Sequence, residues 1–150
     1  MRSGGDRGAL IRDARPEDAE AIARLLGQLG YPVEPAAIVS RLERLRIVGD
    51  RVVVAELDGR VAGLAHLQVS PTIEYDRPAA KIGALVVDEL HRGRGIGRAL
   101  VGAMEAEARA RGCALLFLTT AARRKDAHAF YERVGLEETG KRFAKYLGDT

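Results

Sequence analysis

The feature that most constrains this chain is an apolar run that passes directly into a glycine-rich turn, between Leu85 and Leu100. It begins Leu-Val-Val-Asp-Glu-Leu-His and continues Arg-Gly-Arg-Gly-Ile-Gly-Arg-Ala-Leu. The short β-branched run predicts a strand, and apolar residues at helical spacing after the glycines predict a helix. Glycines at such a junction let the unpaired N–H groups of the first helical turn approach an anion. The segment therefore predicts a phosphate-binding turn.

The spacing of the glycines narrows the kind of phosphate ligand. A dinucleotide fingerprint needs glycine at the first, third and sixth positions, but counting from Gly93 the sixth position is Arg98. A Walker loop needs a lysine after its last glycine, and the segment has none. Arg92, Arg94 and Arg98 add cationic side chains around the turn. The spacing thus disfavours a dinucleotide site and excludes a Walker loop.

The pattern that does fit is Arg92-x-x-Gly95-x-Gly97 after a strand that ends Val-Val-Asp. It resembles the acetyl-CoA signature of the GNAT superfamily of N-acetyltransferases. Residues 11–18 resemble the family's first strand and turn, and residues 127–136 resemble its late helix and the turn that follows. The resemblance extends from residue 10 to residue 147 and implies an α/β fold. The expected sheet is mixed and mostly antiparallel, with a parallel central pair and flanking helices.

Length and composition predict one globular domain. A chain of 150 residues with 47% apolar content is large enough for a single core, so residues 10–150 are expected to form one domain. The resemblance implies that this is an N-acetyltransferase domain. Residues 1–9 are expected to form a disordered tail. There is no apolar run near the ~20 residues needed to span a bilayer and no signal-peptide core. We therefore expect a cytoplasmic protein that does not bind membranes.

The order of strands and helices can be predicted from periodicity, turn residues and caps. The expected helices start at Pro16, Pro35, Gly97 and Asp126, and Gly30 and Gly112 end the first and third of them. The expected strands begin at Leu10 and cover 51–57, 61–68, 81–87 and 115–118, with one or two closing strands in 139–147. Asp58-Gly59 predicts a hairpin, and Gly83 predicts a bulge. The strand-helix-strand order after residue 81 predicts a right-handed crossover and parallel pairing.

The family resemblance implies how acetyl-CoA is held as a cosubstrate. The main chain of Leu85, Val86 and Val87 is expected to pair with the pantetheine arm. The pyrophosphate is expected on the amides of the turn, formed by Arg92, Gly93, Arg94, Gly95, Ile96, Gly97 and Arg98. No metal is expected, because the histidines and the single cysteine are scattered along the chain.

Tyr131 is the expected general acid and part of the cofactor site. Its family counterpart lies in the late helix near the cofactor sulfur. A phenol with a pKa of about 10 stays protonated at neutral pH and can donate to the departing thiolate. The alternative is that Tyr131 is a core aromatic beside Phe130.

The general base is where the sequence departs from the family. Many relatives place a glutamate on the strand before the turn, but residues 81–84 read Lys-Ile-Gly-Ala. Glu74 is the candidate that we assign, and Asp76 and His66 are alternatives that could act directly or through water. Glu74 and Asp76 could equally be solvated loop residues. A second departure is Arg124, which stands where many relatives have an asparagine that contacts the pantetheine.

These residues predict an acetyl-CoA-dependent N-acetyltransferase whose amine acceptor attacks the thioester directly in a ternary complex. The acceptor is a small-molecule amine or a peptide amine. Residues 119–131 and 142–145 are similar to the aminoalkylphosphonate N-acetyltransferase branch, which points to an acceptor that carries an anionic group. Edge strands near the C-terminus could pair across a homodimer.

Two other classes stay open at this point. The missing strand carboxylate suggests a CoA-binding regulatory or interaction module that has lost catalysis. The net charge of +3 and the run Arg123-Arg124-Lys125 permit a nucleic-acid-binding domain. The positive residues are spread along the chain, so we expect no nucleic-acid partner.

Overall fold

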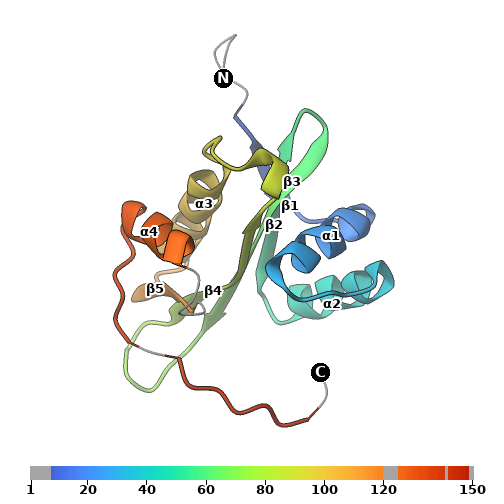
Figure 1. Ribbon diagram of the computed structural model, residues 1–150. Coiled ribbons are helices and arrows are strands. Elements are labelled where there is room, and N and C mark those ends of the chain that lie inside the picture. Colours follow the sequence, from blue (N-terminus) through green and yellow to red (C-terminus); the bar gives the residue numbers. More distant parts are fainter. Residues whose placement is uncertain (1–7, 120–124, 141, 149–150) are drawn as a thin grey trace. The chain divides into compact units, whose positions relative to one another are not determined.

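The computed structural model describes residues 8–119, 125–140 and 142–148 (Figure 1). The chain divides into two compact units, Met1–Phe117 and Leu118–Thr150. None of the helices in the described parts of either unit is long and apolar enough to cross a membrane.

The first unit is built on a mixed sheet whose strand order follows the sequence. The order is β1-β2-β3-β4-β5. Strands β1 to β4 pair antiparallel, whereas β4 and β5 form a parallel pair. The strands are β1 (Leu10–Asp13), β2 (Arg51–Leu57), β3 (Arg60–Ser70), β4 (Ala79–Val87) and β5 (Leu115–Leu118). This confirms the predicted fold class. The parallel pair is expected at the centre of the sheet, whereas β5 is the last of the described strands in the strand order.

Two backbone details of the sheet confirm predictions made from single residues. Asp58 and Gly59 both have positive φ, 51° and 77°, as a tight hairpin turn between β2 and β3 requires. The register between β3 and β4 shifts after His66, which lies opposite Ala84 while Leu67 lies opposite Ile82. Gly83 is therefore the extra residue of a β-bulge.

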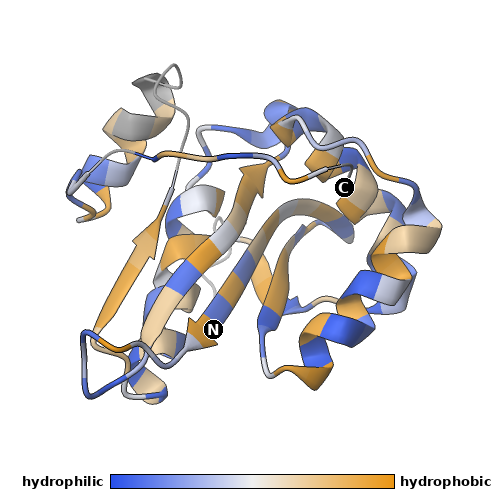
Figure 2. Cartoon of the chain, turned by 90° about the horizontal axis from the view of Figure 1, so that it is seen from below, coloured by the Kyte–Doolittle hydropathy of each residue, from blue (hydrophilic) through white to orange (hydrophobic). Residues whose placement is uncertain are grey.

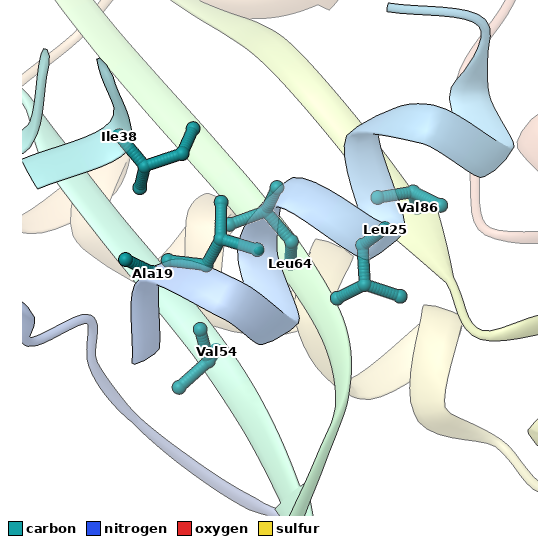
Figure 3. Packing of buried hydrophobic residues seen from close by; sticks show 7 residues of the cluster. Ala19, Leu25, Ile38, Val54, Leu64 and Val86 are labelled. Atoms are coloured by element: carbon teal, nitrogen blue, oxygen red, sulfur yellow. The ribbon is translucent and has the colours of Figure 1, made fainter. Parts of the chain in front are cut away.

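Helices α1 (Ala19–Leu29) and α2 (Pro35–Ile47) cover one face of the sheet. Apolar residues three and four apart, such as Ile22 and Leu25, place one stripe of α1 on the sheet. They pack with Ile38 of α2 against Val54 and Leu64, as Figure 3 shows for most of this cluster. Figure 2 shows hydrophilic residues interspersed with hydrophobic ones along the helices, as an amphipathic pattern requires.

Helix α3 (Ile96–Ala110) packs against the sheet from the opposite side to α1 and α2. Its predicted end is confirmed, because Gly112 has a positive φ of 70° just after the helix. A Cβ on Gly63 of β3 would lie 3.0 Å from both Ile96 Cγ2 and Leu100 Cδ1. Glycine at this position lets the start of α3 approach the sheet closely.

The second unit contains α4 (Lys125–Arg133), which matches the predicted late helix. The predicted closing strands in 139–147 are wrong for residues 139–140 and 142–147, which form no strand. All of these residues are exposed. Without a buried face, nothing in their side chains fixes a strand register.

Candidate functional site

The glycine-rich turn leads into a helix whose first amides have no partner in the helix. Gly95 is the N-cap of α3 and has left-handed backbone angles, φ 79° and ψ 7°. The first helical hydrogen bond runs from the Ala99 N–H to the Gly95 carbonyl, 3.1 Å. The N–H groups of Ile96, Gly97 and Arg98 therefore precede the hydrogen-bond ladder of a 15-residue helix. They form a donor cluster at the positive end of the helix dipole.

The turn also has open space in front of it. Gly93 and Gly95 both have positive φ, 81° and 79°, and a Cβ built on either would meet nothing within 4 Å. Glycine is thus required here by backbone conformation rather than by crowding. The side chains of Arg92, Arg94 and Arg98 are exposed around the turn. Donor amides, free space and mobile cations together fit a phosphate-bearing ligand.

Ile96 anchors the turn to the core. It is only 3% exposed and lies at the first helical position, directly after the exposed residues of the turn. Because Gly63 allows Ile96 to lie close to β3, the helix start is held against the sheet. The donor amides are therefore preorganised rather than mobile.

Asp88 holds the other end of the turn, where β4 ends. The residue is 4% exposed, and its N–H donates to the Ala62 carbonyl at 2.8 Å. Its carboxylate accepts from the Leu90 N–H at 3.1 Å and from Arg24 Nη1 at 2.6 Å. Burial acts to raise the pKa of Asp88, but the hydrogen bonds from Leu90, Arg24 and Gln28 outweigh it and lower that pKa to about 2. Asp88 is accordingly a stable anion at neutral pH.

Helix α1 contributes a second residue that contacts Asp88, namely Gln28. We call the group of Arg24, Gln28 and Asp88 the clasp. Gln28 Nε2 donates to Asp88 Oδ1 at 3.4 Å, and Gln28 Oε1 accepts from the Glu89 N–H at 3.0 Å. Arg24 Nη2 also donates to the Val61 carbonyl at 3.1 Å. Sequence reasoning missed the clasp. The only local pattern is that Arg24 and Gln28 are four residues apart, which places them on one face of a helix. That spacing does not predict which residue the two side chains contact.

The strand before the turn extends past its parallel neighbour. The Ala114 N–H donates to the Pro78 carbonyl at 2.7 Å, so β4 and β5 start at the same level. Strand β4 has nine residues and β5 has four, so the last part of β4 continues beyond the end of β5. Leu85, Val86 and Val87 lie in this part, with Val86 in the core cluster and the other two side chains half-buried. Their side chains serve packing, so the main chain is the part of these residues that a ligand could pair with.

The candidate bases lie at different places. Glu74 and Asp76 are exposed in the loop between β3 and β4, at the opposite end of β4 from the glycine turn. Strand β4 alone spans about 26 Å at the usual rise per residue. His66 instead lies on β3 directly opposite Ala84, and its Nε2 is 2.8 Å from Asp50 Oδ2.

Tyr131 belongs to the second unit. It lies half-buried in α4, and its ring centroid is 5.7 Å from that of Phe130, with an interplanar angle of 64°. This edge contact is compatible with the alternative expectation of an aromatic packing role. Arg123 and Arg124 lie outside the described residues.

The structure thus combines a mixed α/β sheet with a turn after its fourth strand whose free amides suit an anionic ligand. The model of the acetyltransferase (GNAT) family matches residues 18–136. The chain belongs to this family of acetyl-CoA-dependent N-acetyltransferases, which confirms the resemblance drawn from the signature.

Individual relatives agree with the family match. The chain is 37% identical over 90 residues to an aminoalkylphosphonate N-acetyltransferase of Salmonella typhimurium, covering 60% of this chain and 58% of that protein. It is 31% identical to an aminoglycoside N(6')-acetyltransferase of Stenotrophomonas maltophilia, covering 86% of each. An aminoglycoside N-acetyltransferase solved in complex with CoA shares the fold, with a TM-score of 0.81 at 20% identity, covering 99% of this chain and 100% of that one.

Proposed function

We propose that this chain transfers the acetyl group of acetyl-CoA to a primary amine by direct attack in a ternary complex. The observation that carries the proposal is the donor cluster at Ile96, Gly97 and Arg98 beside the extended end of β4. Family membership supplies the activity class. The proposal adds the residues that perform it and the kind of acceptor.

The cosubstrate site extends from the turn to the strand. The pyrophosphate is proposed to accept hydrogen bonds from the amides of Gly93 to Arg98, with the exposed side chains of Arg92, Arg94 and Arg98 balancing its charge. The pantetheine arm is proposed to pair with the main chain of Leu85, Val86 and Val87. The support is that β4 continues past β5 at these residues.

Transfer then depends on positioning and on proton movement. An amine held beside the thioester reacts without the entropy cost of a collision, which is a large part of the catalysis. Tyr131 is proposed to donate a proton or hydrogen bond to the sulfur as the C–S bond breaks. Glu74 is the base predicted from sequence, with Asp76 and His66 as alternatives. No acyl-enzyme is required by this scheme.

The acceptor is proposed to be a small amine that carries an anionic group. One support is the similarity to an aminoalkylphosphonate N-acetyltransferase. Another is that Arg142 and Lys145 are exposed cations, in a segment that resembles this branch by sequence. A peptide amine, which the sequence leaves open, is a second acceptor class, and the similarity to an aminoglycoside N(6')-acetyltransferase adds aminoglycosides as a third. A cytoplasmic location is a part of the proposal that rests on sequence alone. The homodimer expected from sequence loses its support at residues 139–140 and 142–147, which do not form the edge strands expected to pair across it.

The test is release of free CoA thiol from acetyl-CoA in the presence of aminoalkylphosphonates, aminoglycosides, polyamines and peptides. Turnover with one class supports the enzyme and identifies its acceptor. Binding of acetyl-CoA without turnover across the panel favours the alternative, a CoA-binding regulatory module. If the chain does not bind acetyl-CoA at all, the proposed acetyl-CoA site is refuted.

A further inference from the structure

The half-buried pair of His66 and Asp50 lies beside the β4 bulge, where the sequence lacks the expected carboxylate. We infer that His66 is the general base of the proposed acetyl transfer and that Asp50 positions its ring. This inference rests on the proposed function and deepens it, because it assigns the one chemical role that the sequence leaves open.

The register of the sheet places His66 where a base is needed. His66 pairs with Ala84, the last of the four residues 81–84 in which a carboxylate is missing. It also pairs with Val52 of β2, so neither strand neighbour brings a charge to the ring. The cross-strand neighbour thus supplies a titratable group at the same level of the sheet.

The acidic partner sets which ring nitrogen can take up a proton. Asp50 lies in the turn between α2 and β2, and its side chain is 7% exposed. Its Oδ2 is 2.8 Å from His66 Nε2. A carboxylate can only accept, so the neutral ring carries its hydrogen on Nε2 and leaves a lone pair on Nδ1. Asp50 also stabilises the imidazolium that forms when Nδ1 takes a proton.

His66 Nδ1 lies directly over the bulged glycine of β4. A Cβ on Gly83 would lie 2.8 Å from His66 Nδ1, so the basic nitrogen faces the Cα of the bulged residue directly. Gly83 is exposed, and the His66 side chain is 20% exposed. Any residue other than glycine would cover this nitrogen or displace the ring. Because Gly83 is exposed and has no side chain to cover the ring, a ligand on this face of β4 is proposed to reach Nδ1.

The sheet face that carries His66 is the one covered by helices α1 and α2. His66 and Leu64 are two residues apart on β3, and Leu64 packs in the cluster with α1 and α2. Two residues past the bulge, β4 reaches Leu85, where the main chain is proposed to hold the pantetheine.

The proton transfer balances as follows. His66 Nδ1 takes one proton from the ammonium form of the acceptor, and the neutral nitrogen attacks the thioester carbonyl carbon. A C–N bond forms, the C–S bond breaks, and the electron pair leaves with sulfur. The thiolate gains the proton that the new amide nitrogen loses, and the imidazolium returns its proton to solvent. An acceptor with a pKa near 10.4 is about one part in 2,500 neutral at pH 7, so this step is needed for ordinary amines.

The experiment compares two acceptors in wild type, His66→Gln, Asp50→Asn and the control Gln68→Ala. Gln68 is exposed on the same strand, two residues from His66. One acceptor is the best alkyl amine from the thiol-release panel, and the other is an O-alkyl hydroxylamine, which is already unprotonated at neutral pH. We expect His66→Gln to lower kcat for the alkyl amine about 100-fold or more and to change kcat for the hydroxylamine only a few-fold. Asp50→Asn should lower the alkyl amine rate by a smaller factor, and Gln68→Ala should match wild type.

Equal losses for both acceptors in His66→Gln would overturn the inference, because a structural role does not distinguish their pKa values. Loss in Glu74→Gln with His66→Gln unchanged would also overturn it. Nitrogen-15 NMR of the wild type gives a readout that needs no acceptor: hydrogen on Nε2 of the neutral ring supports the inference, and hydrogen on Nδ1 contradicts it. Wild type that acetylates neither acceptor refutes the proposed function itself.

Discussion

Replacing Gly95 by alanine tests whether the helix start holds the cosubstrate. With φ at 79° the site is left-handed, and a Cβ there meets nothing within 4 Å, so the cost to folding is conformational only. An L-residue in this region costs about 1–2 kcal/mol, which lowers the Tm of a chain of this size by about 2–8 °C. If the backbone instead relaxes, the Ile96 and Gly97 amides turn away from the phosphate.

The binding loss can be estimated from one such amide. A hydrogen bond to a charged group contributes about 1.5–3 kcal/mol, so losing it weakens the Kd for acetyl-CoA about ten- to a hundredfold. Gly112→Ala is the matched control. It also has a positive φ, 70°, and open space, but it follows the other end of the same helix. Calorimetric titration of both variants measures the Kd for acetyl-CoA, and thermal unfolding measures the Tm, so the effect on binding is separated from the effect on stability.

The expected result is a similar loss of Tm in both variants and a loss of acetyl-CoA binding in Gly95→Ala alone. Gly95→Val should lose more, because its β-branched side chain is still less tolerant of a positive φ. An unchanged Kd in Gly95→Ala would refute the donor cluster as the phosphate site. Equal binding losses in both alanine variants would show that the effect follows from lowered stability.

Three further predictions concern the clasp and the general acid. Asp88→Asn should lower the free energy of unfolding by about 2 kcal/mol at pH 7, because the folded-state pKa is about 2 and the ordinary value is 3.8. This contribution is complete above pH 3.8 and is lost as the pH falls through about 2, so urea unfolding of the two proteins should converge in acid. Arg24→Ala should weaken acetyl-CoA binding several-fold by loosening the turn, whereas Arg46→Ala, which breaks an exposed pair with Glu43, should leave the Kd unchanged. Tyr131→Phe should lower kcat about 10²- to 10⁴-fold with little change in the Kd for acetyl-CoA, and Tyr146→Phe, an exposed tyrosine, should match wild type in a thiol-release assay.

Local signals were enough to predict most of the sheet and its helices. The hairpin at Asp58-Gly59 and the end of α3 at Gly112 follow from backbone angles with positive φ, and the bulge lies at the glycine that interrupts the strand pattern, Gly83. Features of this kind depend on the residue type at one or two positions and on the adjacent residues, and both can be seen in the sequence. The closing strands failed because residues 142–147 have β-compatible side chains but no buried face to pair.

The contacts that shape the site could not be predicted in the same way. Arg24 and Asp88 are 64 residues apart, and Asp50 and His66 are 16 apart across a strand pair. Neither pair has a local pattern, because each depends on how α1 or the α2–β2 turn packs on the sheet. Glycine is likewise needed at position 63 because α3 packs closely there, and no residue of β3 predicts this close approach.

The most direct test of the central claim follows the acetyl group itself. The chain is incubated with isotopically labelled acetyl-CoA, first alone and then with the acceptor found in the thiol-release panel. The masses of the protein and of the small molecules are then measured by mass spectrometry. The account predicts an unmodified protein in both mixtures and one labelled amide for each CoA released in the second. A labelled protein in the first mixture would contradict direct attack, and bound acetyl-CoA left unconsumed by every amine would contradict the enzyme.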